Sequence, residues 1–320
     1  MEFYTIYKLE FDLSNRDLFS RDNYTLESSK EELIKGFLET LENKPIDKIE
    51  TDRRTYKCYP YIKDNIVLLR IINEKTIEIV HNFETVLVDH EPFQNVIFYL
   101  DKECSYLAIE ISSTFRSKTD TVNNIILEGI SNYLKSDYSS ININSDIIIK
   151  PMAFWLNVDY LLKHTNDTLT EITVKTRHKH TANNEIENME NIQDISEVLN
   201  CNEIETHTYS NIENNNEKQL NTAFGYIKNF TKNKDFEIET KFKKYGRLKQ
   251  DSTLRVKHEI DQTITNGFIS LFEEKNENEE YEAAKIADDK ENKEPDFYFQ
   301  LFQRLEDIKK SVIYTMSNER

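Results

Sequence analysis

The fold of this 320-residue chain is decided by residues 54–111, RTYKCYPYIKDNIVLLRIINEKTIEIVHNFETVLVDHEPFQNVIFYLDKECSYLAIEI. The stretch consists of short runs of β-branched, aromatic and aliphatic residues, separated by polar groups such as Asn73-Glu74. Runs of this length and composition are typical of β-strands. Because no helical pattern separates them, we expect consecutive strands to pair antiparallel, with the last two forming a hairpin.

The segments on either side extend the same domain. Residues 3–13, FYTIYKLEFDL, predict another strand, and a helix is expected over about 29–41. A second helix is expected from Thr119 or Asp120, both good capping residues. This order predicts an α+β fold: a mainly antiparallel sheet with helices packed on one face, plus a smaller mixed C-terminal part.

Changes in composition along the chain suggest its division into parts. We expect an α+β sheet domain over 1–165 and a mixed interaction domain over 166–272. An acidic insertion at 183–218 has nine acidic residues and one basic residue, which is typical of a surface excursion. Residues 273–295 are again acidic and resemble a linker, and residues 296–320 predict a C-terminal helix with one apolar stripe.

The overall composition limits the classes of function. Only five glycines occur, which argues against the glycine-rich loops that cradle phosphates. The three cysteines, Cys58, Cys104 and Cys201, are far apart and form no CxxC pair, so neither a zinc ribbon nor a redox dithiol is indicated. No export signal or membrane-spanning run is visible, so we expect a cytoplasmic protein with no membrane contact and no cofactor.

The clearest local signal is a basic stretch, residues 228–258, with ten Lys/Arg and four Asp/Glu in a chain of net charge −17. Two strands around Tyr245-Gly246 would form a basic hairpin that contacts nucleic acid or a partner protein. Its binding residues would be Lys241, Lys243, Lys244, Arg247, Lys249, Arg255 and Lys257. The alternative is that this hairpin docks on the acidic segments of its own chain or of a partner.

A second candidate site consists of Asp101 and Glu110, which flank the last predicted hairpin. Some metal-dependent nucleases place an acid on one strand and Glu-x-Lys on the next, where the carboxylates hold Mg²⁺. Here Ser112 stands at the lysine position. The alternative interpretation is a turn aspartate and an exposed strand glutamate, so we assign no catalytic and no metal-binding residue.

One segment has a resemblance to known proteins. The runs HEPFQNVIFYLD (90–101), YLAIEIS (106–112) and SKTDTVNNIILEGISNYL (117–134) resemble the middle of uncharacterised bacterial accessory proteins encoded in phage-defence islands and mobile elements. The resemblance covers 90–134 only and transfers no catalytic residue. What it implies is an intracellular bacterial protein that works in a multi-protein system.

Taken together, these observations predict a non-catalytic subunit of a bacterial intracellular complex, in the setting of antiviral defence. It would contact nucleic acid, a partner protein or a second copy of itself through the basic hairpin. Two alternatives remain open: a metal-dependent nucleic-acid-processing enzyme that uses Asp101 and Glu110, and a sensor that binds a phage protein.

Overall fold

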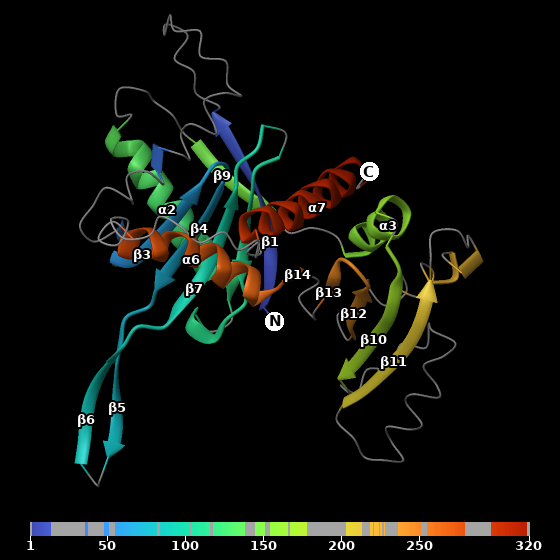
Figure 1. The fold of residues 1–320 in the computed structure, drawn as a ribbon, viewed down its shortest axis with the longest axis horizontal. Helices are drawn as coiled ribbons and strands as arrows, with labels where there is room; N and C mark the ends of the chain where they lie inside the picture. Colours follow the sequence, from blue (N-terminus) through green and yellow to red (C-terminus); the bar gives the residue numbers. More distant parts are fainter. Residues whose placement is uncertain are drawn as a thin grey trace, which may run out of the picture. The chain divides into compact units, whose positions relative to one another are not determined.

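The computed structural model describes the strands, helices and turns that carry the fold (Figure 1). The described residues are 2–13, 36–37, 48–50, 55–81, 84–102, 104–115, 118–137, 145–150, 154–165, 167–177, 203–212, 218–219, 221–223, 225, 227, 236–250, 255–278 and 296–318. They form helices and a mainly antiparallel sheet, which confirms the predicted α+β class. The expected acidic insertion and linker lie largely outside the described residues.

The described chain divides into two compact units. The larger unit contains Glu2–Lys150 and Asp261–Gln303, and the smaller unit contains Pro151–Ile260 and Arg304–Arg320. The expected boundaries near 165 and 272 therefore differ from the compact units. The difference arises because Asp261–Gln303 pack with the first half of the chain, whereas the residues from Arg304 on pack with Pro151–Ile260.

The larger unit is built on an antiparallel sheet. Its strands follow the order β1 (Glu2–Leu13), β8 (Tyr106–Glu110), β7 (Phe93–Tyr99), β4 (Ile66–Ile72), β3 (Thr55–Lys63) and β2 (Lys48–Glu50), and β9 (Ser145–Lys150) also pairs with β1. Strands β5 (Lys75–His81) and β6 (Glu84–His90) form a separate two-stranded ribbon, which extends away from this sheet in Figure 1.

Helices cover both faces of the larger unit's sheet, whereas we expected helices on one face only. Helix α2 (Thr119–Asp137) packs on the side that includes Phe98 and Leu107. On the other side, Phe272 of α6 (Gln262–Asn278) lies 5.6 Å from Tyr61, between ring centroids. The correction follows from the continuous apolar runs, because a strand covered on both faces needs apolar residues at every position. Strand β7 is buried at every residue after Phe93.

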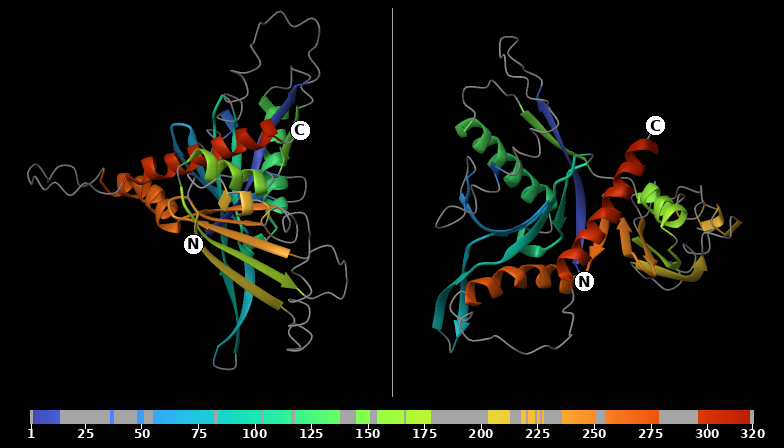
Figure 2. Two further views of the ribbon diagram at one scale, coloured as in Figure 1. Left: turned by 90° about the vertical axis from the view of Figure 1, so that its right-hand side faces the viewer. Right: turned by 45° about the horizontal axis from the view of Figure 1, so that its top comes forward.

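The smaller unit has a second run of antiparallel strands with cover on one face. Their order is β11 (Glu203–Ile212), β10 (Leu169–Arg177), β12 (Phe236–Phe242), β13 (Gly246–Gln250) and β14 (Val256–Ile260). The expected two-stranded basic hairpin is thus a three-stranded meander. Figure 2 shows helix α3 (Phe154–His164) and the C-terminal part of α7 (Phe297–Asn318) on one side of these strands.

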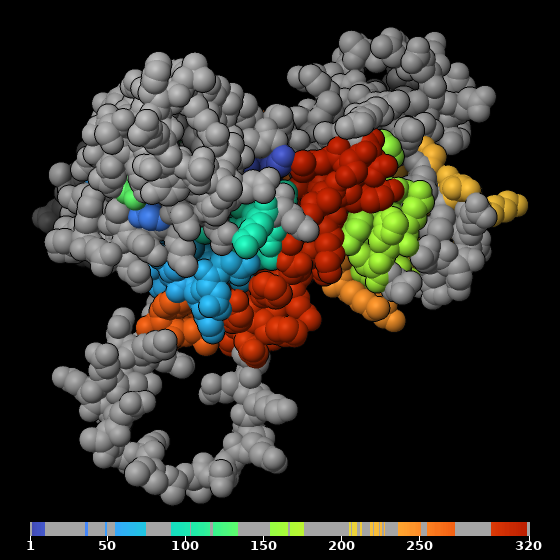
Figure 3. Space-filling view, turned by 90° about the horizontal axis from the view of Figure 1, so that it is seen from above, coloured from blue at the N-terminus to red at the C-terminus, as the bar shows by residue number. Residues whose placement is uncertain are grey.

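Helices α3 and α7 are joined by buried polar contacts. The Ser311 hydroxyl donates to the Asn157 side-chain oxygen, and the Tyr314 hydroxyl donates to the Asp159 carboxylate. The two helices lie side by side in Figure 3. The predicted apolar stripe of α7 is buried, since Leu305, Ile308 and Val312 are fully covered. This pairing places both helices on one face of the smaller unit's strands.

Candidate binding surface on the smaller unit

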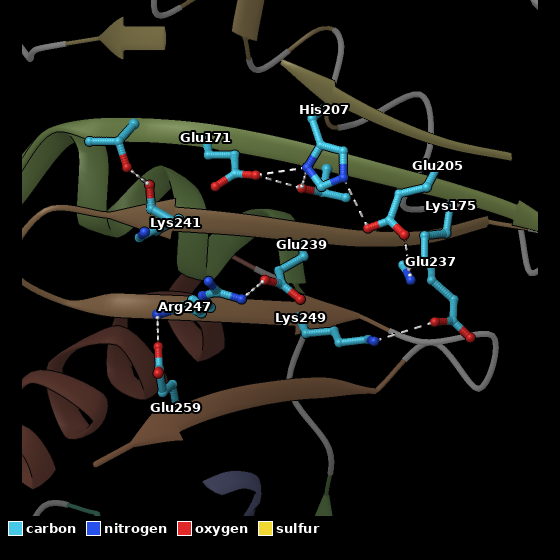
Figure 4. A network of polar contacts seen from close by, with 12 residues as sticks. Glu171, Lys175, Glu205, His207, Glu237, Glu239, Lys241, Arg247, Lys249 and Glu259 are labelled. Atoms are coloured by element: carbon cyan, nitrogen blue, oxygen red, sulfur yellow. Dashed lines mark hydrogen bonds and ion pairs between the residues drawn. The ribbon is translucent and has the colours of Figure 1, made fainter. Parts of the chain in front are cut away.

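The outward face of the smaller unit's strands is lined by charged side chains. Strand β12 alternates buried Phe236, Ile238 and Phe242 with partly exposed acids and an exposed lysine, the period expected of a strand covered on one face. We call this surface the charged face. Ten residues define it (Figure 4): Glu171, Lys175, Glu205, His207, Glu237, Glu239, Lys241, Arg247, Lys249 and Glu259.

Acids and bases of the charged face are paired across neighbouring strands. Lys175 Nζ lies 2.7 Å from a Glu205 carboxylate oxygen, and Arg247 Nη1 lies 2.9 Å from one of Glu239. Lys175 is directly opposite Glu205, which stabilises the strand pair. Arg247, in contrast, is directly opposite Lys241 and reaches Glu239 diagonally. The basic residues that the sequence singled out therefore lie among carboxylates of their own sheet.

Histidine 207 stands between two carboxylates of the charged face. Its Nδ1 lies 2.8 Å from Glu171 Oε1 and its Nε2 lies 3.3 Å from Glu205 Oε1. The hydrogen bond from His207 holds the pKa of Glu171 below its ordinary value. The two ring nitrogens point to opposite sides of the imidazole, so these groups do not converge on one point as metal ligands must. Within the described residues no cluster of His, Cys, Asp or Glu could hold a metal ion.

The turn between β12 and β13 is held by a buried carboxylate. Asp167 accepts hydrogen bonds from the backbone N–H groups of Lys244 and Tyr245, at 3.0 Å and 2.8 Å. Gly246 follows with φ of 86°, a conformation that favours glycine. The exposed Lys243 and Lys244 side chains are therefore presented at a fixed turn beside the charged face.

The structure brings most of the predicted basic residues to one sheet. Lys241, Arg247 and Lys249 lie on the charged face, and Lys257 is paired in register with Lys249 on the next strand. Arg255 directly precedes β14 and is partly buried. The sequence did not reveal that Glu171 and Glu205 lie on neighbouring strands, because these pairings join segments that are far apart in the chain.

A buried polar cluster on the opposite side anchors this sheet to α7. The Arg304 guanidinium lies 3.4 Å from the ring centroid of Tyr245 and donates to the Glu259 backbone oxygen. The Tyr245 hydroxyl lies 2.7 Å from Nδ1 of His258. Burial, with a smaller contribution from Arg304, lowers the pKa of His258 to about 3, so its imidazole is neutral in the folded chain. One sequence signal indicated this, because His258 shares the period-two face of the apolar Val256 and Ile260.

The carboxylates of Asp101 and Glu110 are not brought together. Tyr99 pairs with Tyr106, which puts Asp101 at the turn of the hairpin, where its backbone contacts the Ser105 hydroxyl. Glu110 ends β8 at the far end of the hairpin. At about 3.3 Å per residue the two backbones are separated by more than about 13 Å, too far to share one ion.

Glu110 nevertheless has an unusual environment. One carboxylate oxygen accepts the backbone N–H of Asn95 at 2.8 Å. Burial raises the pKa of Glu110 to about 7, an effect partly opposed by that hydrogen bond. The carboxyl is thus protonated in the folded chain at mildly acidic pH, unlike an exposed strand glutamate.

Comparisons with protein-family models, with curated proteins and with solved structures found no match to this chain. None of the helices in the described ranges combines the length and the apolar character that crossing a membrane requires.

Proposed function

We propose that this chain is a non-catalytic subunit of a bacterial cytoplasmic complex and that it contacts a partner protein through the charged face. The observation that carries the proposal is the one-sided cover of the smaller unit's strands. One side packs on α3 and α7, while the other directs charged side chains outward. The resemblance of residues 90–134 supports a setting in phage defence or in a mobile element.

A protein fits the charged face better than nucleic acid does. Nucleic-acid binding depends on lysines and arginines that neutralise phosphates. Here Arg247 and Lys249 each have a carboxylate of β12 within 4 Å, at 2.9 Å and 3.4 Å, so an approaching phosphate would also meet those acids. A partner protein with both signs of charge can complement the alternating pattern, which favours specificity and orientation.

The test is affinity purification of the tagged chain from cells that also express its neighbouring genes. We compare the wild type with Lys241→Glu combined with Lys243→Glu, which reverses two exposed charges on and beside the charged face. The matched control reverses two exposed lysines of the larger unit, Lys102→Glu with Lys118→Glu. A stoichiometric protein should be recovered with the wild type and the control, and lost with the first variant.

A gel-shift assay with labelled DNA and RNA provides the counter-test. Salt-sensitive binding of either nucleic acid, abolished by the Lys241→Glu and Lys243→Glu variant, would contradict a protein partner. Equal recovery of the same protein by all three forms would contradict the charged face as the contact surface.

A further inference from the structure

We propose that the outer edge of β11 holds the partner by accepting an extended segment as an added strand, with Lys or Arg at alternate positions. The inference rests on the proposed function, because it identifies where on the smaller unit the partner binds and what chemistry it has. The added strand would extend the charged face by one strand.

Strand β11 lies at the end of the smaller unit's strand order. Among the described strands it pairs only with β10. A strand in that position presents a row of N–H and C=O groups that can pair with another chain. Proteins often protect such edges with lysine or proline, yet Glu203–Ile212, EIETHTYSNI, contains neither. The edge is therefore chemically suited to strand addition.

An irregularity in the pairing defines the usable part of the edge. Leu169 pairs with Ile212 and Glu171 pairs with Tyr209. Between these two pairs, β11 therefore contains one residue more than β10. The extra residue of such a bulge bends the strand and interrupts regular pairing. From Tyr209 back to Glu203 the register is continuous. An added strand would pair with this regular part.

In the row through Glu205, the sign of the charge alternates across β11, β10 and β12. Glu205 is opposite Lys175, and Lys175 is in turn opposite Glu237. The Glu237 carboxylate pairs with Lys249 at 3.4 Å. The directly opposed residues across β11, β10 and β12 are thus negative, positive and negative, and Lys249 reaches Glu237 diagonally, since its register partner is Glu239. Because opposed strands are stabilised by opposite charges, the next strand beyond Glu205 should carry a positive charge.

The other outward residues of β11 refine the partner's pattern. Tyr209 is 77% exposed, and its ring stacks on His207 with an interplanar angle of 14°. A large exposed aromatic ring four residues from Glu205 offers a surface for an aliphatic stem or a cation. A segment that alternates lysine with small β-forming residues satisfies both positions. The negative net charge of the chain, −17, further favours a basic segment.

The test uses two synthetic peptides of ten residues, the length of β11. One alternates lysine with threonine, and the control alternates glutamate with threonine. Fluorescence anisotropy measures binding to the full chain, and hydrogen exchange measures protection of the β11 amides. We expect the lysine peptide to bind about tenfold more tightly, from a charge pair with Glu205 and a cation–π contact with Tyr209, and to protect residues 203–209.

A double variant makes the test specific to the edge. Glu205→Lys combined with Lys175→Glu keeps an ion pair between β11 and β10 while it reverses the charge at the edge. This variant should prefer the glutamate peptide. Equal binding of both peptides, or tighter lysine-peptide binding without protection of 203–209, would overturn the inference. A dimer of the free chain that the double variant dissociates would also overturn it, since a second copy would then occupy the edge.

The failure of this inference is distinguishable from the failure of the proposed function. If the purified partner is lost with Lys241→Glu and Lys243→Glu but both peptides bind equally, the charged face is the contact surface and the edge is not. If the peptide preference inverts as expected while the partner is retained by that variant, the edge accepts strands but the charged face does not hold the partner.

Discussion

The sheets of the two units differ in how their faces are covered. In the larger unit, strands such as β4 and β7 are buried at nearly every position, because helices cover both faces of their sheet. In the smaller unit, β12 and β14 alternate buried and partly exposed residues, because α3 and α7 pack on one face and the charged face lies on the other. Alternating burial along a strand therefore indicates that one face of its sheet is free for contact, whereas continuous burial indicates that both faces are covered.

The largest expected effects come from truncating adjacent residues in each unit. In the larger unit, the Ile97 and Phe98 side chains point to opposite faces of the sheet. Replacing either with alanine should lower the free energy of unfolding by about 2–5 kcal/mol. In the smaller unit, Ile238→Ala should cost a similar amount, whereas Glu239→Ala should cost less than about 1 kcal/mol. Urea denaturation measures all four. If Ile97→Ala lowered the free energy of unfolding only slightly, one face of the larger unit's sheet would be open to solvent.

Acid should destabilise the smaller unit through His258. Its pKa is about 3 in the folded chain against an ordinary value of 6.5, so the unfolded chain takes up a proton that the folded chain refuses. The contribution of neutral His258 to the free energy of unfolding is therefore fully present above pH 6.5. It falls as the pH drops toward 3, by on the order of 4 kcal/mol. Trp155, the only tryptophan, lies in α3 and reports this unit by fluorescence.

The control for that prediction is His258→Gln, which keeps a polar partner for Tyr245 but does not titrate. Its unfolding free energy, followed through Trp155, should depend less on pH between 3 and 6.5. An unchanged pH profile would mean that His258 is not the titrating group.

The larger unit should show the opposite slope through Glu110. Burial raises the pKa of this carboxyl from 4.5 to about 7, so the folded chain keeps a proton that the unfolded chain has lost. Its stability should fall as the pH rises from 4.5 to 7, by on the order of 2 kcal/mol after allowance for partial exposure. At pH 8, Glu110→Gln should stabilise the larger unit, measured as slower amide exchange in β7 and β8. Faster exchange would contradict the assignment.

The smallest effect is expected for an ion pair of the charged face. Arg247→Ala removes the contact with Glu239, but such partly exposed surface pairs contribute only about 1 kcal/mol and are screened by salt. The unfolding midpoint of the variant should therefore approach that of the wild type at high salt. A loss of several kcal/mol would mean that these charges serve stability rather than contact.

Much of the larger unit could be predicted from its sequence, because its strands are apolar runs between polar breaks. The run NVIFYL, residues 95–100, even carried the signal of cover on both faces, since it is apolar almost throughout. Helix α6 was not predicted, because Gly267 and the two threonines, Thr263 and Thr265, weaken its helical pattern. Its position is set by packing on Tyr61 and on neighbouring rings.

The smaller unit was harder to predict because its strands are polar. Strand β13, GRLKQ, has one aliphatic residue, and β11 has a polar sequence within a region expected to be a surface excursion. Both are strands because of their pairing partners rather than their own composition. The basic residues of the candidate site were identified from the sequence. Of the acidic residues on the charged face, the sequence placed only Glu237 and Glu239 on the same side of a strand as a candidate lysine, Lys241 of β12.

Chemical footprinting of the free chain and of its purified complex tests most directly whether the partner binds through the charged face. In the free chain, Lys241 and Tyr209 should be modified readily, as the exposed Lys118 of the larger unit should be. In the complex, we expect strong protection of Lys241 and Tyr209 with no change at Lys118. Equal modification of Lys241 and Tyr209 in the free and bound chains would contradict binding through the charged face.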